Sequence, residues 1–347
     1  DHIYAGLETT YGRNFCSYAL AFLTFSKSGV SSTELEDLLS IENEVLKDVF
    51  QYSDPETGRL PSHVLSRLLS DLEELIAQGE NGVYRWHHRQ LREAAERRYE
   101  KLKLKVHKTM AIYFCNFELL DVGKYGNRED RRVQEMPLLF SDTPVWFDKA
   151  LVNRRRCVEG AYHCVQANML KEAAEMICDV EAVCAHLREG EGFNILDYVI
   201  ELNERIESLN ENSEEKVGDR VYDYYRWLLQ SMSALVKKPT FQIGVTLSSM
   251  PTTSMARRDY LSRVALLQNG AFGKDSFITA QAMGGFKEFG ACLMNLEGHT
   301  NQVNSVCFNH DGSQIASGSK DNTVKVWNAK TGDLVQTLEG HSSSVNS

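Results

Sequence analysis

The sequence predicts a multidomain, mainly α-helical chain that ends in an all-β segment. Three observations lead to this fold class. The 347 residues exceed what one ordinary core needs, and two or three domains are expected at this length. Through much of the first 236 positions apolar residues recur at helical spacing, as they do from Phe15 to Phe25. After Gly298 they alternate between short groups of turn residues, which is a pattern that strands adopt and helices do not.

The first hundred residues combine short helices with a small hairpin. The sequence SSTE at Ser31–Glu34 predicts a capping box that starts a helix. Apolar residues from Val64 to Leu75 form one face of a further helix. The stretch LIAQGENGVYRW then predicts a hairpin with its turn at Gly79–Gly82. Helices followed by a small hairpin are the order of a winged helix, which we expect over residues 1–100.

Residues 101–236 predict a stack of helical repeats, that is, a superhelical domain. Paired helical patterns run through Cys157–Leu187, with alanine at many close-packing positions. From Lys237 to about Gly290 glycine, serine, threonine and methionine become common and the helical period fades. We therefore expect a linker over 237–290.

The overall charge limits the partners that this chain can have. A net charge of −10 argues against a surface built to hold nucleic acid or anionic lipid. The apolar stretches are much shorter than the roughly 20 residues that span a bilayer, and the N-terminus has no signal segment. We expect a cytoplasmic protein without membrane contact.

The eight cysteines predict buried, reduced thiols, because none forms a Cys-x-x-Cys pair. A zinc site is the alternative, suggested by two histidines among three of the cysteines. We expect no metal, because paired ligand spacing is missing. The residues of this alternative are His163, Cys164, Cys178, Cys184 and His186.

The C-terminal segment repeats itself. LEGHTNQVNS begins at Leu296 and LEGHSSSVNS begins at Leu338, a period of 42 residues. A period of about 40 to 45 residues, opening on Gly-His and carrying a late Trp, is typical of a propeller blade with four strands. Residues 291–347 thus predict the first repeat and the start of a second. Because a propeller closes with about four blades or more, we expect an incomplete propeller and a chain that is a fragment of a longer protein.

Four residues of this segment resemble the hydrogen-bonded tetrad of the WD-repeat family: His299, Ser317, Asp321 and Trp327. In that family the tetrad ties a loop to the strands. Serine, histidine and aspartate also form hydrolase triads. The resemblance implies a structural role instead, and a chain that is not an enzyme. Asn328 stands where the family usually has aspartate after the Trp.

Phosphate-binding motifs fail at the residue that would follow the lysine. Gly123-Lys124 precedes Tyr125, and Gly273-Lys274 precedes Asp275, so neither supplies the Ser or Thr that holds magnesium. Two basic groups could touch phosphates, although solvated helix faces explain them better in an acidic protein. They are Lys101, Lys103, Lys105, His107 and Lys108, and the triplet Arg154–Arg156.

The stretch WHHRQLREAA resembles the segment that closes the winged helix in NACHT-type signalling ATPases. Trp86 matches the aromatic residue of that segment, His88 its histidine and Glu93 its acid. The resemblance implies that His88 reaches the phosphates of a nucleotide and holds the closed, inactive form. An ordinary surface or helix-capping histidine is the alternative.

The winged helix, the helical stack and the blade together resemble the part that follows the ATPase core in NACHT and WD-repeat proteins, which belong to the STAND group of signalling NTPases. The resemblance implies a non-enzymatic regulatory and scaffolding segment, with ATP or ADP bound by a core outside this chain. It also implies protein partners for the propeller and leaves room for oligomerisation of the longer protein. The alternatives are a WD-repeat adaptor with a helical arm and no NTPase, and a winged-helix nucleic-acid binder.

Overall fold

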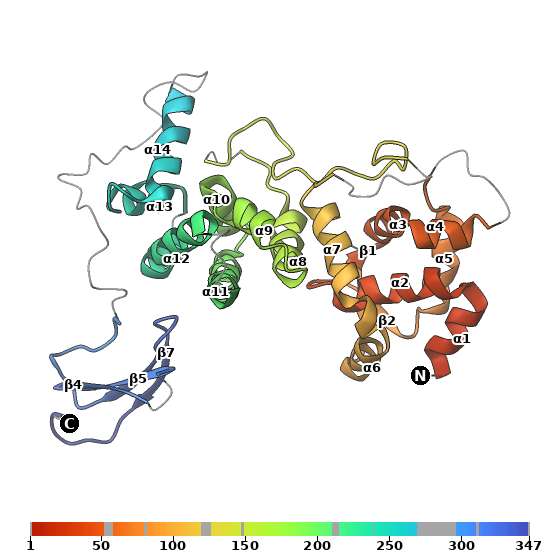
Figure 1. Ribbon diagram of the computed structural model, residues 1–347. Coiled ribbons are helices and arrows are strands. Elements are labelled where there is room, and N and C mark those ends of the chain that lie inside the picture. The colour runs from red at the N-terminus through yellow and green to blue at the C-terminus, as the bar shows by residue number, and fades with distance from the viewer. Residues whose placement is uncertain are drawn as a thin grey trace. The chain divides into compact units, whose positions relative to one another are not determined.

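The structure is a computed structural model that describes residues 2–51, 58–79, 82–118, 126–146, 149–209, 215–237, 239–268, 296–309 and 312–345. Figure 1 shows the helices and strands coloured along the chain from the N-terminus. The chain divides into two units. One contains Asp1–Tyr222 and Leu235–Ile243, and the other contains Asp223–Ala234 and Gly244–Ser347. No helix among the described residues is long and apolar enough to span a bilayer.

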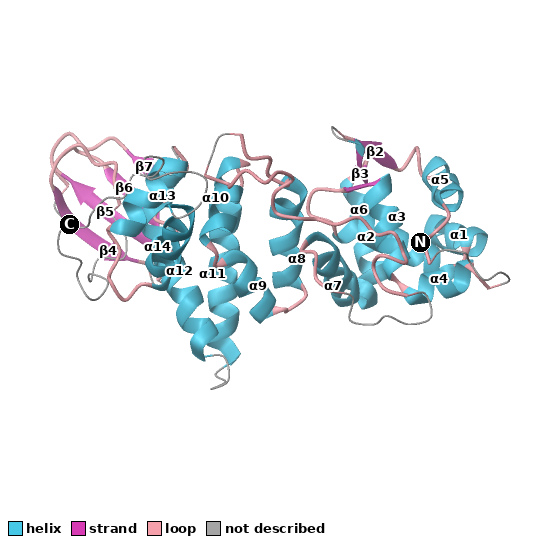
Figure 2. Ribbon diagram, turned by 90° about the horizontal axis from the view of Figure 1, so that it is seen from above, coloured by secondary structure: helices cyan, strands magenta, loops and turns pink. Residues whose placement is uncertain are grey.

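The N-terminal part of the first unit is a winged helix, as the sequence predicts. Its three short strands form one antiparallel sheet in the order β1-β3-β2, which places the hairpin beside the start of α3 (Figure 2). The elements are α1 (His2–Tyr11), α2 (Arg13–Phe25), β1 (Val30–Ser31), α3 (Ser32–Ile41), α4 (Asn43–Val49), α5 (Ser62–Asp71), β2 (Ile76–Gln78), β3 (Val83–Trp86) and α6 (Arg89–Tyr99).

Helix α2 is the centre of this domain because ten of its residues are buried, on every side of the helix. The predicted capping box starts α3. The Glu34 amide donates to Ser31 Oγ at 3.2 Å, and the Ser31 amide donates to Glu34 Oε2 at 2.8 Å. Between α2 and β1 the chain turns at Gly29 with φ 92°. A Cβ there would lie 2.6 Å from the Tyr84 carbonyl oxygen, so only glycine fits.

The helical stack continues from the winged helix, and as far as Tyr222 it belongs to the same unit. Helix α7 (Lys103–Phe114) packs against the π-helical turn η3 (Arg156–Gly160) and α8 (Ala161–Gln166). A short 3-10 turn, η2 (Glu100–Leu102), joins α6 to α7. The predicted alanine packing is present at Ala173, Ala174, Ala182 and Ala185, all buried. The further helices are α9 (Leu170–Ile177), α10 (Val180–Arg188), α11 (Gly192–Leu209) and α12 (Glu215–Leu235).

The predicted linker is wrong for its first thirty or so residues, which form α13 (Pro239–Ser248) and α14 (Met255–Gln268). Tertiary contacts stabilise these helices where the local pattern is weak. The Asp223 carboxylate accepts hydrogen bonds from Ser254 Oγ at 2.8 Å and from the Ala256 amide at 2.9 Å, at the start of α14. Trp227 is fully buried and donates to Thr246 Oγ1 at 3.0 Å. Residues 269–290 of the predicted linker lie outside the described residues.

The C-terminal blade has the four strands that the sequence predicts, hydrogen-bonded in chain order as an antiparallel sheet. The start of the second repeat returns to this sheet, because the Val345 amide donates to the Ser319 carbonyl at 3.0 Å. Large apolar side chains on the first and last strands are exposed, among them Phe308 and Val335. The strands are β4 (Val303–Phe308), β5 (Gln314–Ser319), β6 (Val324–Asn328) and β7 (Leu334–Leu338).

The predicted burial of the cysteines is confirmed at six positions and wrong at one. Cys307 is exposed because it lies on β4 among other exposed residues. Cys292 lies outside the described residues. The buried thiols are Cys16, Cys115, Cys157, Cys164, Cys178 and Cys184.

Candidate anion site on the winged helix

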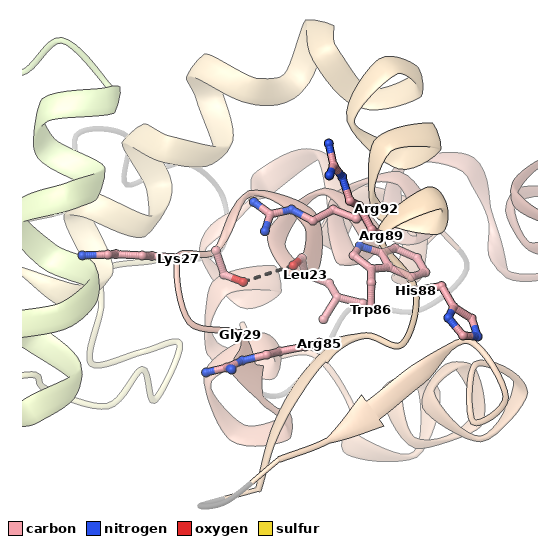
Figure 3. A pocket seen from close by; sticks show the side chains of 9 residues that line it. Leu23, Lys27, Gly29, Arg85, Trp86, His88, Arg89 and Arg92 are labelled. Carbon is pink, nitrogen blue, oxygen red and sulfur yellow. Dashed lines mark hydrogen bonds between the residues drawn. The ribbon is translucent and has the colours of Figure 1, made fainter. Parts of the chain in front are cut away.

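An open pocket of about 260 Å³ lies where the end of β3, the start of α6 and the turn after α2 meet (Figure 3). Five of its nine lining residues carry basic side chains, and His88 is one of them. The lining is Leu23, Ser26, Lys27, Gly29, Arg85, Trp86, His88, Arg89 and Arg92. The pocket therefore concentrates positive charge on a protein whose net charge is −10.

The first turn of α6 adds to this positive potential. His88 occupies the N-cap, but its side chain makes no capping hydrogen bond, and the first turn carries no acidic residue. Arginine is present there instead, at Arg89. The N-terminus of a helix carries a partial positive charge and free amide groups, which an anion stabilises and a cation does not. Helix α6 thus begins in a way that favours a bound anion.

Local contacts hold the arginine side chains and leave their terminal nitrogens available. Arg85 Nε donates to the Ser28 carbonyl at 2.6 Å. Arg89 Nε pairs with Glu93 at 2.6 Å, and Arg92 Nε pairs with Glu96 at 2.9 Å. Within the described part of the chain, the Nη atoms of these three arginines have no hydrogen-bond partner.

Trp86 and His88 have different surroundings. Trp86 is partly buried and donates from Nε1 to Thr24 Oγ1 at 3.0 Å, which fixes the end of β3 to α2. His88 is exposed, and its Nε2 lies 3.2 Å from Nδ1 of His87. In Figure 3 its ring lies on the far side of Trp86 from Lys27. The structure therefore places His88 at the rim of the pocket. The Glu93 carboxylate forms an ion pair with Arg89.

A buried ion cluster, which the sequence patterns did not predict, joins the winged helix to the stack. The Glu159 carboxylate has an exposed fraction of 0%. It accepts hydrogen bonds from the Lys27 amide at 3.0 Å and the Ser28 amide at 2.9 Å. Arg155 lies 3.2 Å from the same carboxylate. The signal in the sequence was the triplet Arg154–Arg156. It indicated surface charge and did not reveal that Arg155 pairs with a buried acid, Glu159, four residues later.

Two histidines extend this cluster into the core. His163 Nε2 lies 3.1 Å from Glu159, and His163 Nδ1 lies 2.8 Å from Nδ1 of His107. If His163 donates to the carboxylate, its Nδ1 must accept, so His107 donates from Nδ1. Burial lowers the pKa of both histidines, that of His107 to about 3. Both rings are therefore neutral near pH 7.

Burial by itself would raise the pKa of Glu159. Hydrogen bonds and the nearby Arg155 charge more than offset burial and lower the pKa to about 2. The carboxylate is therefore ionised, and it is stabilised by two backbone amides and one guanidinium. A buried anion of this kind fixes the turn from Lys27 to Gly29 that forms one wall of the pocket.

The basic groups of the sequence divide between surface and interior. Arg155 is paired in the cluster, Arg156 donates to the Met136 carbonyl at 2.7 Å, and Arg154 is largely exposed. Lys105 lies 3.3 Å from Glu42, and His107 is buried, whereas Lys101, Lys103 and Lys108 are exposed.

The residues of the zinc alternative lie in the stack with other contacts. Cys164 Sγ lies 3.3 Å from Cys115 Sγ, and His186 Nδ1 lies 2.7 Å from the Ala182 carbonyl. Among the described residues, no group of three or more His, Cys, Asp and Glu side chains could hold a metal ion.

The four tetrad residues of the blade form one chain of hydrogen bonds. Trp327 Nε1 donates to Ser317 Oγ at 2.7 Å, Ser317 Oγ lies 2.8 Å from His299 Nε2, and His299 Nδ1 lies 2.9 Å from Asp321. With a neutral His299 imidazole, Trp327 donates to Ser317, Ser317 donates to His299, and His299 donates to Asp321, so each of these protons has one acceptor. Hydrogen bonds from Thr323 lower the pKa of Asp321. Ser317 is buried at 4% exposure and accepts from Trp327, which suits a structural hydroxyl rather than a nucleophile.

Asn328 does not weaken the blade. Its Oδ1 accepts the Lys330 amide at 2.8 Å and the Thr331 amide at 3.1 Å. These are hydrogen bonds that an aspartate oxygen could also accept, so the amide oxygen serves equally in the turn before β7.

Two family models match this chain, one in its N-terminal part and one in its C-terminal part. The family model described as NWD1-like, winged helix-turn-helix domain matches residues 4–107. The model described as WD domain, G-beta repeat matches residues 290–328.

Several longer proteins are similar to this chain. Human NACHT domain- and WD repeat-containing protein 1 is 30% identical over 188 residues, which cover 49% of this chain and 12% of that protein. Mouse NACHT and WD repeat domain-containing protein 2 is 27% identical over 198 residues, covering 47% and 11%. Vegetative incompatibility protein HET-E-1 of Podospora anserina is 36% identical over 112 residues, covering 32% and 7%. The matched region is therefore a small part of these relatives' length.

Proposed function

Since this chain belongs to the family of NACHT and WD-repeat domain-containing proteins, we propose that it is a regulatory and scaffolding segment of a signalling switch. In this proposal the winged helix and the stack connect a nucleotide-binding core, located elsewhere in a longer cytoplasmic protein, to a propeller that binds other proteins. The chain itself catalyses no reaction.

The basic pocket beside α6 is the observation that carries this proposal. A phosphate group fits it because Arg85, Arg89 and Arg92 offer Nη atoms without other partners and the first turn of α6 offers free amides. ATP or ADP would supply that phosphate. Arginine suits such a role because its planar group donates two hydrogen bonds to phosphate oxygens.

His88 acts at the rim of this pocket as the sensor of the phosphates. Its exposed imidazole can donate to a phosphate oxygen in the closed form and separate from it when the winged helix rotates. His87, at 3.2 Å, holds the ring in place when no phosphate is present.

The blade supports the scaffolding half of the proposal. Its outer strands expose large apolar side chains, including Val306 at 62% and Phe308 at 64%. Further blades of the longer protein would cover these strands, and the completed propeller would present loops to protein partners. The buried, fully hydrogen-bonded Ser317 supports a role in stability and not in hydrolysis.

The experiment is a calorimetric titration of the chain with ADP and with inorganic pyrophosphate at low salt. We expect both to bind, and we expect Arg89→Gln to weaken each about three- to tenfold, as loss of one typical hydrogen bond does. Arg97→Gln is the matched control, because Arg97 is an exposed arginine of the same helix outside the pocket.

Two results would contradict the proposal. Equal affinity of wild type and Arg89→Gln would move any phosphate site away from this pocket. A duplex DNA that binds more tightly than either phosphate ligand, with steep salt dependence, would favour the nucleic-acid alternative.

A further inference from the structure

Lys27 lines the anion pocket, but its ammonium group belongs to a different contact. Lys27 Nζ donates to the hydroxyl of Tyr198 on α11 and lies 4.6 Å from the centre of that ring. In Figure 3 the side chain points away from Arg85 and Trp86 towards the helices of the stack. One lysine therefore lies at both the pocket and the junction between winged helix and stack.

The backbone of Lys27 stays in place whichever partner its side chain takes. The Lys27 and Ser28 amides donate to the buried Glu159 carboxylate, and the Gly29 carbonyl accepts from Arg155 Nη2 at 2.8 Å. Four methylene groups separate the ammonium from this fixed backbone. The side chain can thus change partner by rotation about its own bonds.

The present partner does not fully stabilise the Lys27 charge. Tyr198 is a neutral acceptor with 5% exposure, and burial lowers the pKa of the Lys27 ammonium by more than the nearby carboxylates of Glu191, Glu159 and Asp197 raise it. Both hydrogen bonds are charge-assisted because the donor is an ammonium, but a phosphate oxygen also carries negative charge and adds a Coulombic attraction that the neutral hydroxyl lacks. A phosphate in the pocket would therefore attract Lys27 away from the tyrosine.

We infer that a phosphate anion in the pocket competes with Tyr198 for the Lys27 ammonium, so that an occupied pocket weakens the contact between the winged helix and α11. This inference rests on the anion site of the proposed function. Because coupling between two equilibria is reciprocal, weakening the Lys27–Tyr198 contact must strengthen anion binding by the same factor.

Inorganic pyrophosphate is the probe, and its affinity for the chain is measured by calorimetry. Tyr198→Phe keeps the ring and removes only the hydroxyl that accepts from Lys27, so we expect affinity to rise about three- to tenfold, the net contribution of one typical hydrogen bond. Lys27→Met should lower affinity, and adding Tyr198→Phe to Lys27→Met should change nothing further. Tyr11→Phe is the control, because it removes a hydroxyl bonded to Asp71 at 2.5 Å, away from the pocket lining.

A second measurement needs no variant. Saturating pyrophosphate should speed hydrogen exchange in the wild-type peptide that contains Tyr198. Binding that weakens with Lys27→Met but does not change with Tyr198→Phe, together with unchanged exchange, would reject the competition and leave the anion site standing. Absence of pyrophosphate binding in wild type and Tyr198→Phe alike would reject the anion site and the competition with it.

Discussion

Arg155 and Glu34 form a two-point ion pair between the stack and the winged helix: Arg155 Nε lies 2.7 Å from Glu34 Oε1, and Nη2 lies 3.1 Å from Oε2. The same Glu34 oxygen Oε2 accepts the Ser31 amide in the capping box of α3. The residue that starts a helix in one domain is therefore also the residue that the next domain binds. Loss of Arg155 should consequently destabilise both domains.

Replacing Arg155 with Met should lower the free energy of unfolding of the first unit by about 3 kcal/mol. The substitution leaves Glu34 and the fully buried Glu159 without their guanidinium partner, and breaking a buried pair from one side costs about 3–5 kcal/mol. Urea unfolding followed by circular dichroism measures the change. Arg154→Met is the control, since Arg154 is 61% exposed and should change stability by less than about 0.5 kcal/mol. Equal effects of both variants would contradict the bridging role.

Acidification from pH 7 to pH 5 should destabilise the first unit through the buried His107, His163 and His186. Burial lowers all three folded-state pKa values, so the unfolded chain binds more protons, and stability falls as the pH drops below about 6.5. Each histidine contributes at most about 1.4 kcal/mol per pH unit.

Urea unfolding across this pH range tests the origin of that slope. His107→Asn retains a donor near the Nδ1 position and cannot titrate, so its slope should be smaller than that of wild type. His63→Asn, at an exposed position of α5, should keep the wild-type slope. A His107→Asn slope equal to that of wild type would show that the buried pair does not set the pH dependence.

Gly29→Ala should destabilise the winged helix by about 1–3 kcal/mol more than Gly12→Ala does. Both glycines have φ 92°, so the strain of the left-handed region is common to the two variants. Only Gly29 has a neighbour that a methyl group would strike, the Tyr84 carbonyl oxygen, whereas nothing lies within 4 Å at Gly12. Thermal unfolding of the two variants measures the difference, and equal losses would mean that the hairpin shifts freely to make room.

Ser317→Ala should speed hydrogen exchange throughout the blade. The substitution leaves the buried Trp327 indole N–H without its acceptor and His299 without a donor, which costs about 1–3 kcal/mol. Ser342→Ala, at an exposed position, is the control and should leave exchange unchanged. Normal protection in Ser317→Ala would contradict the stabilising role of the tetrad.

Local chemistry explains which parts of the fold the sequence predicted. The capping box at Ser31 and the hairpin before Trp86 depend on residues only a few positions apart, so their patterns are visible in the chain itself. Helix α1 was not predicted. Its Tyr4 is buried and donates to the Leu91 carbonyl at 2.8 Å, a contact 87 residues away that no local pattern reveals. The linker prediction failed over α13 and α14 for the same reason, since Asp223 and Trp227 stabilise those helices from α12.

The candidate site, too, contains residues that the sequence could predict and residues that it could not. His88 could be singled out from the stretch WHHRQLREAA, and the blade tetrad from its 42-residue repeat, because both are short motifs. The partners of Lys27 could not be predicted, because Glu159 and Tyr198 lie 132 and 171 positions away. The sequence by itself determined the order of the domains and the residues that carry their motifs. Only the tertiary structure decided that a basic pocket and a buried acid share one turn, because the charges that meet there come from distant segments whose spacing follows no periodic rule.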